Sequence, residues 1–524
     1  MAVIGKNILE NLTTGMYSES KTIFREYIQN ACDQIDLAIS EGILDSDDAL
    51  VEIYIENKNR RIVIEDNATG ISKDVFQQQL GDIANSDKQI GKDKGFRGIG
   101  RLSGLAYCSK LVFTTSYKGE SEKSVMTWDA KHMRTLLSDN KKHTIDEVLE
   151  QIVEFSSAED DIDSHFFRVE LIEINPENTT LLNKEEVIIY LSFVAPVKYK
   201  NTFLLREDVY NHARDIGLQI DEYNITVNGQ QVYKDYGTVL YESYGQSKKQ
   251  YDEVKTLEFR DFHLKNGELL GWMWTGLSAF EKQIPNINMM RGIRLRQGNI
   301  QIGDGITLRE LFKETRAIFY FIGEVFVVHK DLIPNSQRNY FIENEARVEF
   351  EDVLREYFYD VLHKLYTHAN ADKGNYKAQA KYIDLAKDYE DKVKNNEFID
   401  EEDRQRKKFE LEKAQQNAEK AIRKLERSSV SEDENSPFSI VSKNIADIYK
   451  SDKLEEKVKR TQEKVETIES KKEEVDDLPY MTTNLPKLTR SEQKLIGRIY
   501  SIIKEAVSEE LSDMIIRRIQ EELK

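Results

Sequence analysis

The chain has few of the residues typical of cross-linked or membrane-spanning proteins. It holds only two cysteines among 524 residues, Cys32 and Cys108, and their spacing matches neither a metal site nor a disulfide framework. No apolar run approaches the roughly 18 residues of a membrane-spanning helix, so no membrane partner is expected. The N-terminus lacks a basic stretch followed by an apolar one, which argues against a signal peptide. Together these absences favour a reducing, cytoplasmic setting.

Positive charge is also scarce. The formal net charge is −19, from 75 lysines and arginines against 94 aspartates and glutamates. This balance argues against a surface that binds nucleic acid throughout, although a local basic groove is still compatible with it. Charged residues make up 32% of the chain and hydrophobic ones 39%, which indicates globular cores joined to long solvated helices.

The most informative segment is a polar stripe on an early predicted helix. Glu26 and Asn30 are four residues apart, and Asn30 and Asp33 are three apart, so all three side chains fall on one helical face. The flanking Ile23 and Ile28 would pack this helix against a sheet. Taken alone, such spacing is more often the solvated face of an amphipathic helix than a ligand site.

Three later segments favour the ligand site. A β-branched run ends in Asp66 and a turn with Gly70, which predicts a strand end that offers an acid to an amine and a glycine to a flat ring. A polar stretch around Asn85 follows. The glycines of 95–100 then precede a helical segment, where backbone N–H groups can hold phosphate oxygens. One glycine-rich turn is a weak signal, but the ordered set predicts a nucleotide site.

In this order the segments resemble the Bergerat-fold (GHKL) ATPases, which include gyrase B, heat-shock protein 90, histidine kinases, MutL and MORC proteins. The resemblance is strongest to the heat-shock protein 90 branch, over Phe24–Asp33, Leu80–Ser86 and Gly95–Ser103. It implies an α+β fold, with a Bergerat-type α/β sandwich, an α/β transducer-like middle domain and a helical coiled-coil C-terminal part. It also implies ATP and Mg²⁺ as cofactors.

The resemblance assigns a role to each matched residue. Glu26 is the general base that activates water, and Asn30 holds Mg²⁺ against the phosphates. Asp33 supports the site, Asp66 binds the adenine amine, and Gly70 lies under the ring. The other nucleotide-binding positions that the family pattern implies are Asn85, Gly95, Arg97, Gly98, Ile99 and Gly100.

Two positions depart from the family pattern. The family's Asp-x-Gly-x-Gly is Asp66-x-Ala68-x-Gly70 here, so this loop is expected to be stiffer. The family also carries a strand threonine after a glycine. Ser164 is the candidate for that hydroxyl, although no glycine precedes it, and the neighbouring His165 is predicted to be a turn or surface histidine.

A distant segment resembles the middle-domain loop of the same branch. Asp331, Leu332, Asn335 and Arg338 match that loop in register. In that family the arginine reaches the γ-phosphate, a task that suits a planar, permanently charged group able to bind two phosphate oxygens. The alternative is an arginine that caps a loop carboxylate or carbonyl. The position along the chain favours the phosphate role.

Four regions are predicted: an ATP-binding domain over 1–195, a transducer-like domain over 196–370, a charged helical hairpin over 371–480 and a C-terminal amphipathic helix over 481–524. Heptad-like apolar spacing marks two long helices around a polar linker, 427–437. These helices would pair as an antiparallel hairpin or, alternatively, between two subunits. The terminal helix, expected to be continuous from Arg490, must bury its apolar stripe within the chain or in a dimer.

Two functions fit these features. The first is an ATP-gated clamp or chaperone-like switch, a homodimer in which Arg338 completes the ATP site and whose partner is a client protein or an operon-encoded effector. The second is a DNA-associated clamp like MutL or MORC, which the acidic balance disfavours. A histidine kinase is disfavoured because the ATP domain comes first. Antiphage defence is an expectation from family analogy, and no residue indicates it.

Overall fold

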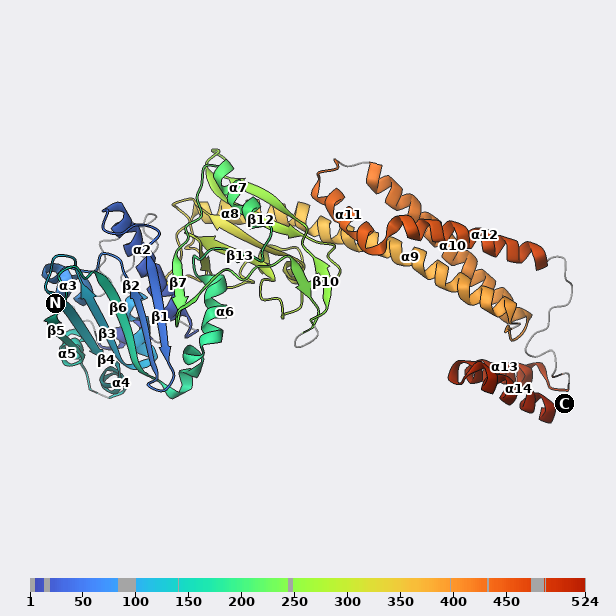
Figure 1. The fold of residues 1–524 in the computed structure, drawn as a ribbon, viewed down its shortest axis with the longest axis horizontal. Coiled ribbons are helices and arrows are strands. Elements are labelled where there is room, and N and C mark those ends of the chain that lie inside the picture. Colours follow the sequence, from blue (N-terminus) through green and yellow to red (C-terminus); the bar gives the residue numbers. More distant parts are fainter. Residues whose placement is uncertain are drawn as a thin grey trace. The chain divides into compact units, whose positions relative to one another are not determined.

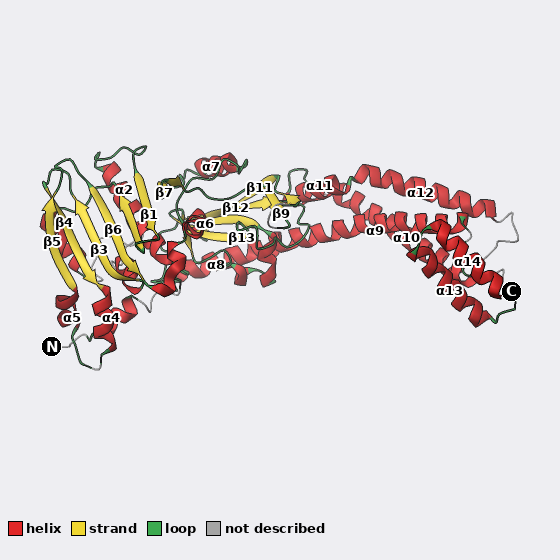
Figure 2. Cartoon of the chain, turned by 60° about the horizontal axis from the view of Figure 1, so that its bottom comes forward, coloured by secondary structure: helices red, strands yellow, loops and turns green. Residues whose placement is uncertain are grey.

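The computed structural model describes residues 5–13, 19–82, 100–139, 141–243, 248–395, 397–430, 433–472, 485 and 487–523. The chain forms two compact units, residues 1–278 with 282–363 and residues 279–281 with 364–524. The described strands all belong to the first unit, and the second is helical (Figure 2). The predicted α+β class is therefore confirmed.

The first unit begins with an eight-stranded sheet (Figure 1). Its strands are β1 (Leu50–Glu56), β2 (Arg61–Asp66), β3 (Cys108–Ser116), β4 (Glu122–Asp129), β5 (Val153–Glu159), β6 (Phe166–Ile174), β7 (Asn224–Val227) and β8 (Gln230–Gln231). Their order is β5-β4-β3-β6-β2-β1-β7-β8, and every pair is antiparallel except β1 with β7. Because β7 and β8 come from beyond residue 195, this sheet extends past the range predicted for the ATP-binding domain.

Helices cover this sheet. They are α1 (Asn7–Leu12), α2 (Thr22–Ser40), α3 (Lys73–Gly81), α4 (Ala130–Ser138), α5 (Ile145–Ile152), α6 (Lys184–Val194) and the 3₁₀ turns η1 (Gly100–Ala106) and η2 (Pro176–Leu182). Along α2, Phe24, Ile28 and Ile35 recur at helical spacing and are buried, which seats the helix on the common core. Alternate residues of β1 are buried as well, as expected for a sheet with one covered face.

A second sheet of five strands follows in the same unit, in the order β11-β12-β15-β13-β14. The elements of this region are α7 (Arg206–Asp215), β9 (Val239–Tyr241), β10 (Gln250–Glu253), β11 (Thr256–His263), β12 (Leu269–Leu277), β13 (Gly292–Gln297), β14 (Ile300–Ile302), η3 (Arg309–Leu311), η4 (Thr315–Tyr320), β15 (Ile322–Val327), α8 (Glu345–Tyr357) and the π-turn η5 (Phe358–Leu362). Every residue of β15 is buried, so this strand has both faces covered, and the loop after it is held by a rigid support.

The second unit is built from α9 (His363–Lys394, from Lys364 onward), α10 (Glu401–Val430), α11 (Pro437–Tyr449), α12 (Ser451–Lys472), α13 (Arg490–Ala506) and α14 (Glu509–Leu523). Tyr382 of α9, Leu411 of α10 and Val458 of α12 share one core, and Gln462 Nε2 donates to Glu419 Oε1 at 3.1 Å. The two predicted long helices therefore meet within one chain, with α9 as a third. Among the described residues, no helix has both the length and the apolar character needed to cross a bilayer.

The expectation of one continuous terminal helix was wrong. Val507 has an extended backbone, with φ −135° and ψ 170°, between α13 and α14. Ser508 then begins a new helix, and its carbonyl accepts from Ser512 N at 2.9 Å. A serine followed by two glutamates stabilises a helix N-terminus. The apolar period continues across this break, so periodicity did not reveal it.

Candidate functional site

α2 places the predicted polar stripe beside the first sheet. Glu26 is 8% exposed, whereas Asn30 and Asp33 further along the helix are half-buried. The preceding Arg25 is buried too. The stripe is therefore deepest at Glu26, which is a carboxylate in surroundings where an unpaired charge is costly.

Arg25 and Gly100 define the position of the Glu26 carboxylate. Arg25 Nη2 and Nε donate to Glu26 Oε1 at 3.2 and 3.4 Å. The other oxygen, Oε2, lies against Gly100, where an added Cβ would be only 2.5 Å from it. A larger residue at position 100 would displace the carboxylate. The structure thus brings the predicted base and the last glycine of the predicted phosphate turn into contact.

The loop after β15 reaches the same arginine. Arg25 Nη2 donates to Gln337 O at 3.0 Å, across 312 positions of sequence. The next residue, Arg338, is buried and has φ +53°, a left-handed conformation that is uncommon outside glycine. Its N–H donates to Asn335 O at 3.1 Å, and its carbonyl accepts from Gly303 N at 2.8 Å. Glu26 and the turn that carries Arg338 therefore meet at Arg25.

Asn335 shapes this loop. Its N–H donates to Tyr340 O at 2.8 Å, and its side-chain Oδ1 accepts from Asn339 N at 3.2 Å. The start of the loop is tied to the five-stranded sheet, because Gln297 Nε2 donates to Leu332 O at 3.0 Å. An asparagine that satisfies backbone groups across a tight turn is a common device, and here it accounts for the asparagine in the sequence motif.

The adenine end of the predicted site lies where β2 stops. Asp66 is buried, and its Oδ1 accepts from Ala68 N at 3.1 Å. Gly70 has φ +68°, and a Cβ there would lie 1.9 Å from Ser116 O, so only glycine fits. Ala68, which stands in place of a family glycine, is not among the described residues with positive φ. Its methyl group is therefore accommodated without backbone strain.

Two residues that were not predicted as site residues hold this turn in place: Thr115, and His165, which was predicted to be a turn or surface histidine. Thr115 Oγ1 accepts from Ile71 N at 2.9 Å and donates to Phe166 O at 2.8 Å. His165 is half-buried, and its Nδ1 lies 2.8 Å from Ala68 O. Ser164 forms a backbone hydrogen bond to Asp161 O. Nothing in the alternating strand around Thr115 distinguished it from its neighbours, because its partners come from distant segments.

The predicted nucleotide-binding residues Asn85, Gly95, Arg97, Gly98 and Ile99 lie outside the described residues. Two described residues that flank this segment are joined, because Arg101 Nη2 donates to Asp82 O. Tyr27 of α2 anchors η1, because its hydroxyl donates to Arg101 O and accepts from Gly104 N, each at 3.0 Å. Burial lowers the pKa of Arg101 to about 10.

The chemistry of these groups fits a magnesium nucleotide. At Gly70 and Gly100 a side chain would clash with Ser116 O and with the Glu26 carboxylate, and the buried Asp66 carboxylate can accept from an exocyclic amine. The half-buried Asn30 offers an amide oxygen, a donor that Mg²⁺ accepts alongside phosphate oxygens and water. The described residues contain no group of three His, Cys, Asp or Glu that could hold a metal.

The same region of the chain is similar to known proteins. Residues 19–159 match the family described as histidine kinase-, DNA gyrase B- and HSP90-like ATPases. Chaperone protein HtpG of Halalkalibacterium halodurans is 27% identical over 131 residues, covering 22% of this chain and 21% of the relative. HtpG of Rickettsia typhi is 27% identical over 183 residues (32% and 29%), and that of Bacillus licheniformis 31% over 133 (22% and 21%).

The N-terminal part of the chain is therefore an ATPase domain of the GHKL superfamily. The similarity to the HtpG chaperones supports the heat-shock protein 90-like branch that the sequence resemblance predicted. The chain spans between 21% and 29% of the length of these relatives. The match accordingly defines the domain and its class.

Proposed function

We propose that this protein is a Mg²⁺-dependent ATPase that works as a conformational switch, with a site composed of the ATPase domain and the loop after β15. One observation carries the proposal. Arg25 contacts Glu26 at 3.2 Å and the carbonyl of Gln337 at 3.0 Å, so the residue next to Arg338 lies at the side of the first motif. A nucleotide-binding domain that acted alone would have no use for this contact.

In this proposal, Glu26 accepts a proton from the water that attacks the γ-phosphorus. Arg25 fixes one carboxylate oxygen, and the other lies beside Gly100. Asn30 would hold Mg²⁺, which when bound neutralises charge on the phosphate oxygens. Arg338 would donate to the γ-phosphate, as an always-charged guanidinium does well. The residues thereby orient the nucleophile and stabilise developing charge.

The rest of the site selects the nucleotide. Asp66 would accept a hydrogen bond from the adenine amine, and Gly70 would let the ring approach the backbone. Asp33 would support this end of α2. Because only ATP has the phosphate that Arg338 would contact, ATP and ADP would favour different arrangements of the loop, and this difference is what a switch requires.

Assembly into a homodimer through α13 and α14 is part of the proposal. Leu495, Ile502 and Met514 are 58%, 63% and 62% exposed, a concentration of apolar side chains that is typical of an interaction surface. Ile502→Asp combined with Met514→Asp should convert a dimer into a monomer in sedimentation experiments. A wild-type chain that sediments as a monomer at micromolar concentration would exclude this part of the proposal.

The central experiment measures ATP hydrolysis by the full chain with Mg²⁺ and with EDTA, alone, with an unfolded protein and with duplex DNA. We expect hydrolysis that needs Mg²⁺ and that is stimulated by the unfolded protein or unaffected by either addition. Stimulation by DNA alone would favour the DNA-associated clamp instead. Failure of the wild type to bind or hydrolyse ATP would refute the proposal. Antiphage defence stays an expectation from analogy.

A further inference from the structure

A chain of hydrogen bonds supports the Arg338 turn from the five-stranded sheet. Gly303 N donates to Arg338 O at 2.8 Å, and Gly303 O accepts from Gln301 Nε2 at 2.9 Å. Gln301 Oε1 in turn accepts from Arg294 Nη1 at 2.9 Å. Both Gln301 and Arg294 are buried, at 3% and 7% exposure. Three successive bonds thus join a guanidinium on β13 to the backbone of the turn.

Two glycines keep this support compact. Gly303 has φ +65°, and a Cβ there would lie 2.7 Å from Asn339 O, in the residue after Arg338. A Cβ on Gly305 would lie 3.0 Å from Arg294 Nη1. Position 303 therefore admits no side chain, and one at position 305 would push against the guanidinium.

The other end of the chain of contacts reaches α6. The guanidinium carbon of Arg294 lies 4.2 Å from the centre of the Phe193 ring, a cation–π contact. Phe193 is in the last turn of α6, whose first turn meets Lys21 through Glu186 at 2.9 Å. Arg294 therefore contacts both a helix of the ATPase domain and the support of the Arg338 turn.

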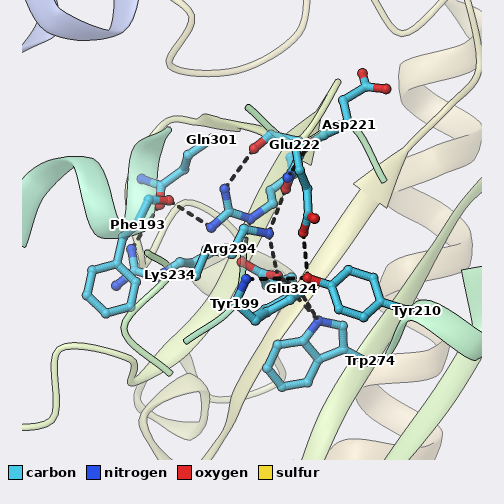
Figure 3. Close-up of polar contacts among 12 residues, drawn as sticks. Phe193, Tyr199, Tyr210, Asp221, Glu222, Lys234, Trp274, Arg294, Gln301 and Glu324 are labelled. Atoms are coloured by element: carbon cyan, nitrogen blue, oxygen red, sulfur yellow. Dashed lines mark hydrogen bonds and ion pairs between the residues drawn. The ribbon is translucent and has the colours of Figure 1, made fainter. Parts of the chain in front are cut away.

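Gln301 is set apart from the larger polar cluster beside it. Figure 3 shows Phe193 and Gln301 on one side and Tyr199, Trp274 and Glu324 on the other. The cluster around Glu324 lies within the sheet, whereas both ends of the Gln301 amide are used, one by Arg294 and one by Gly303. A buried amide that joins a fixed cation to a loop carbonyl determines where that loop lies.

We propose that Gln301 is a positioning residue for Arg338, and that the series Arg294, Gln301 and Gly303 holds the left-handed turn in register with the end of α6. The inference rests on the proposed contact between Arg338 and the γ-phosphate. Loss of Gln301 should therefore weaken recognition of the γ-phosphate and leave recognition of the rest of the nucleotide intact.

The test compares the affinities of the full chain for ADP and for the β,γ-imido analogue of ATP by calorimetry. Arg338→Ala should reduce the preference for the analogue by about 10-fold. Gln301→Leu should reduce this preference to a similar extent. The double variant Arg338→Ala/Gln301→Leu should lose no more of the preference than either single variant. Gln301→Glu still accepts from Arg294 but cannot donate to Gly303 O, so it should lose the preference while keeping the wild-type Tm.

Gln231→Leu is the matched control. Gln231 Nε2 also donates to backbone carbonyls, those of Ile225 and Val232, each at 3.2 Å, but it does not contact the Arg338 turn. This variant should keep the preference for the analogue. A similar loss in Gln231→Leu would mean that any weakened glutamine contact has this effect, and it would overturn the positioning role.

The remaining outcomes distinguish the positioning role of Gln301 from the proposed contact between Arg338 and the γ-phosphate. If both Gln301 variants keep the preference and Arg338→Ala loses it, the positioning role is wrong and the proposed composite site stands. If Arg338→Ala also keeps it, the γ-phosphate contact itself is wrong. Equal weakening of ADP and analogue binding by Gln301→Leu, or an additive double variant, would make Gln301 a purely structural residue.

Discussion

The Arg25–Glu26 pair of α2 and the Arg296–Glu324 pair of the five-stranded sheet join the same two kinds of side chain in buried surroundings. Arg25 and Glu26 are 3.2 Å apart, with side chains 7% and 10% exposed. Both side chains of the Arg296–Glu324 pair are fully buried. The two pairs differ most in what else surrounds the carboxylate.

Glu324 is surrounded by donors. Besides Arg296, it accepts from Lys234 Nζ at 3.3 Å, from Trp274 Nε1 at 3.4 Å and from the Tyr199 hydroxyl. Burial would raise the pKa of Glu324, but Arg296 and Lys234 hold it at about 2. Such a carboxylate is locked in charge and in place, and its contribution is structural.

Among the described residues, the Glu26 side chain has a single hydrogen-bonding partner, Arg25, and its second oxygen lies against Gly100. A buried carboxylate with one oxygen held and one oxygen available is oriented and can still accept a proton. The two carboxylates thus differ in how many donors surround them, although their burial is similar, and under the proposed function this difference would distinguish a structural pair from a chemical one.

The largest effect should come from removing the Glu26 carboxylate, which has fewer hydrogen-bond donors than Glu324. Glu26→Ala should lower kcat for ATP hydrolysis by about 10²- to 10⁴-fold, because the water loses its proton acceptor. ADP affinity should stay close to that of the wild type. Steady-state kinetics and calorimetry measure the two quantities. Lost nucleotide binding, or hydrolysis at the wild-type rate, would place Glu26 with the structural pair.

Glu324→Leu should lower stability rather than chemistry. It leaves Arg296 and Lys234 buried without their anion, and breaking such a pair costs about 3–5 kcal/mol. Unfolding in urea, followed by the fluorescence of Trp272 and Trp274, measures the loss. Glu314→Leu is the control, because the Glu314–Arg316 pair is exposed and should contribute less than about 1 kcal/mol. Equal losses in the two variants would contradict the comparison.

Arg338→Ala should lower turnover by roughly 10- to 100-fold, because the γ-phosphate loses a charged donor. The affinity for ADP, which lacks that phosphate, should not change. Kinetics and ADP titration with the same preparation provide both values. Unchanged turnover would return Arg338 to the alternative of a loop-capping arginine, and the composite site would lose its second half.

The smallest expected effect is a pH dependence of the free energy of unfolding, which arises from Lys234 in the cluster around Glu324. Burial and the neighbouring Arg296 lower the pKa of Lys234 to about 7, despite Glu324. A lysine in an unfolded chain has a pKa of about 10.4. Between these values the unfolded chain binds a proton that folded Lys234 has released, so the free energy of unfolding rises with pH from about 7 to about 10.

Lys234→Met removes this titration. Between pH 7 and pH 9 the wild type should gain about 2 kcal/mol more stability than the variant. Urea unfolding at both pH values, monitored by tryptophan fluorescence, provides the four free energies. A variant that gains as much as the wild type would show that Lys234 stays charged across this range.

Local patterns in the sequence predicted a helix or strand well where its hydrophobic periodicity alone determines the secondary structure. The stripe of Glu26, Asn30 and Asp33 lies on α2, and the β-branched run that ends at Asp66 is β2. The break at Val507 was missed because the helical period continues across it. The addition of β7 and β8 to the first sheet was missed because a parallel pairing with β1 joins segments some 170 residues apart.

Short-range sequence thus predicted the class of site: an acid and amide on a helix, an acid at a strand end, and glycines where a nucleotide would need room. Three-dimensional packing decided where these groups lie and what they contact. Three features depend on contacts between distant segments: Gln337 meets Arg25, Thr115 and His165 hold the turn after Asp66, and Glu324 has several donors where Glu26 has one. No local period encodes such contacts, because they form only when the sheets and helices have packed.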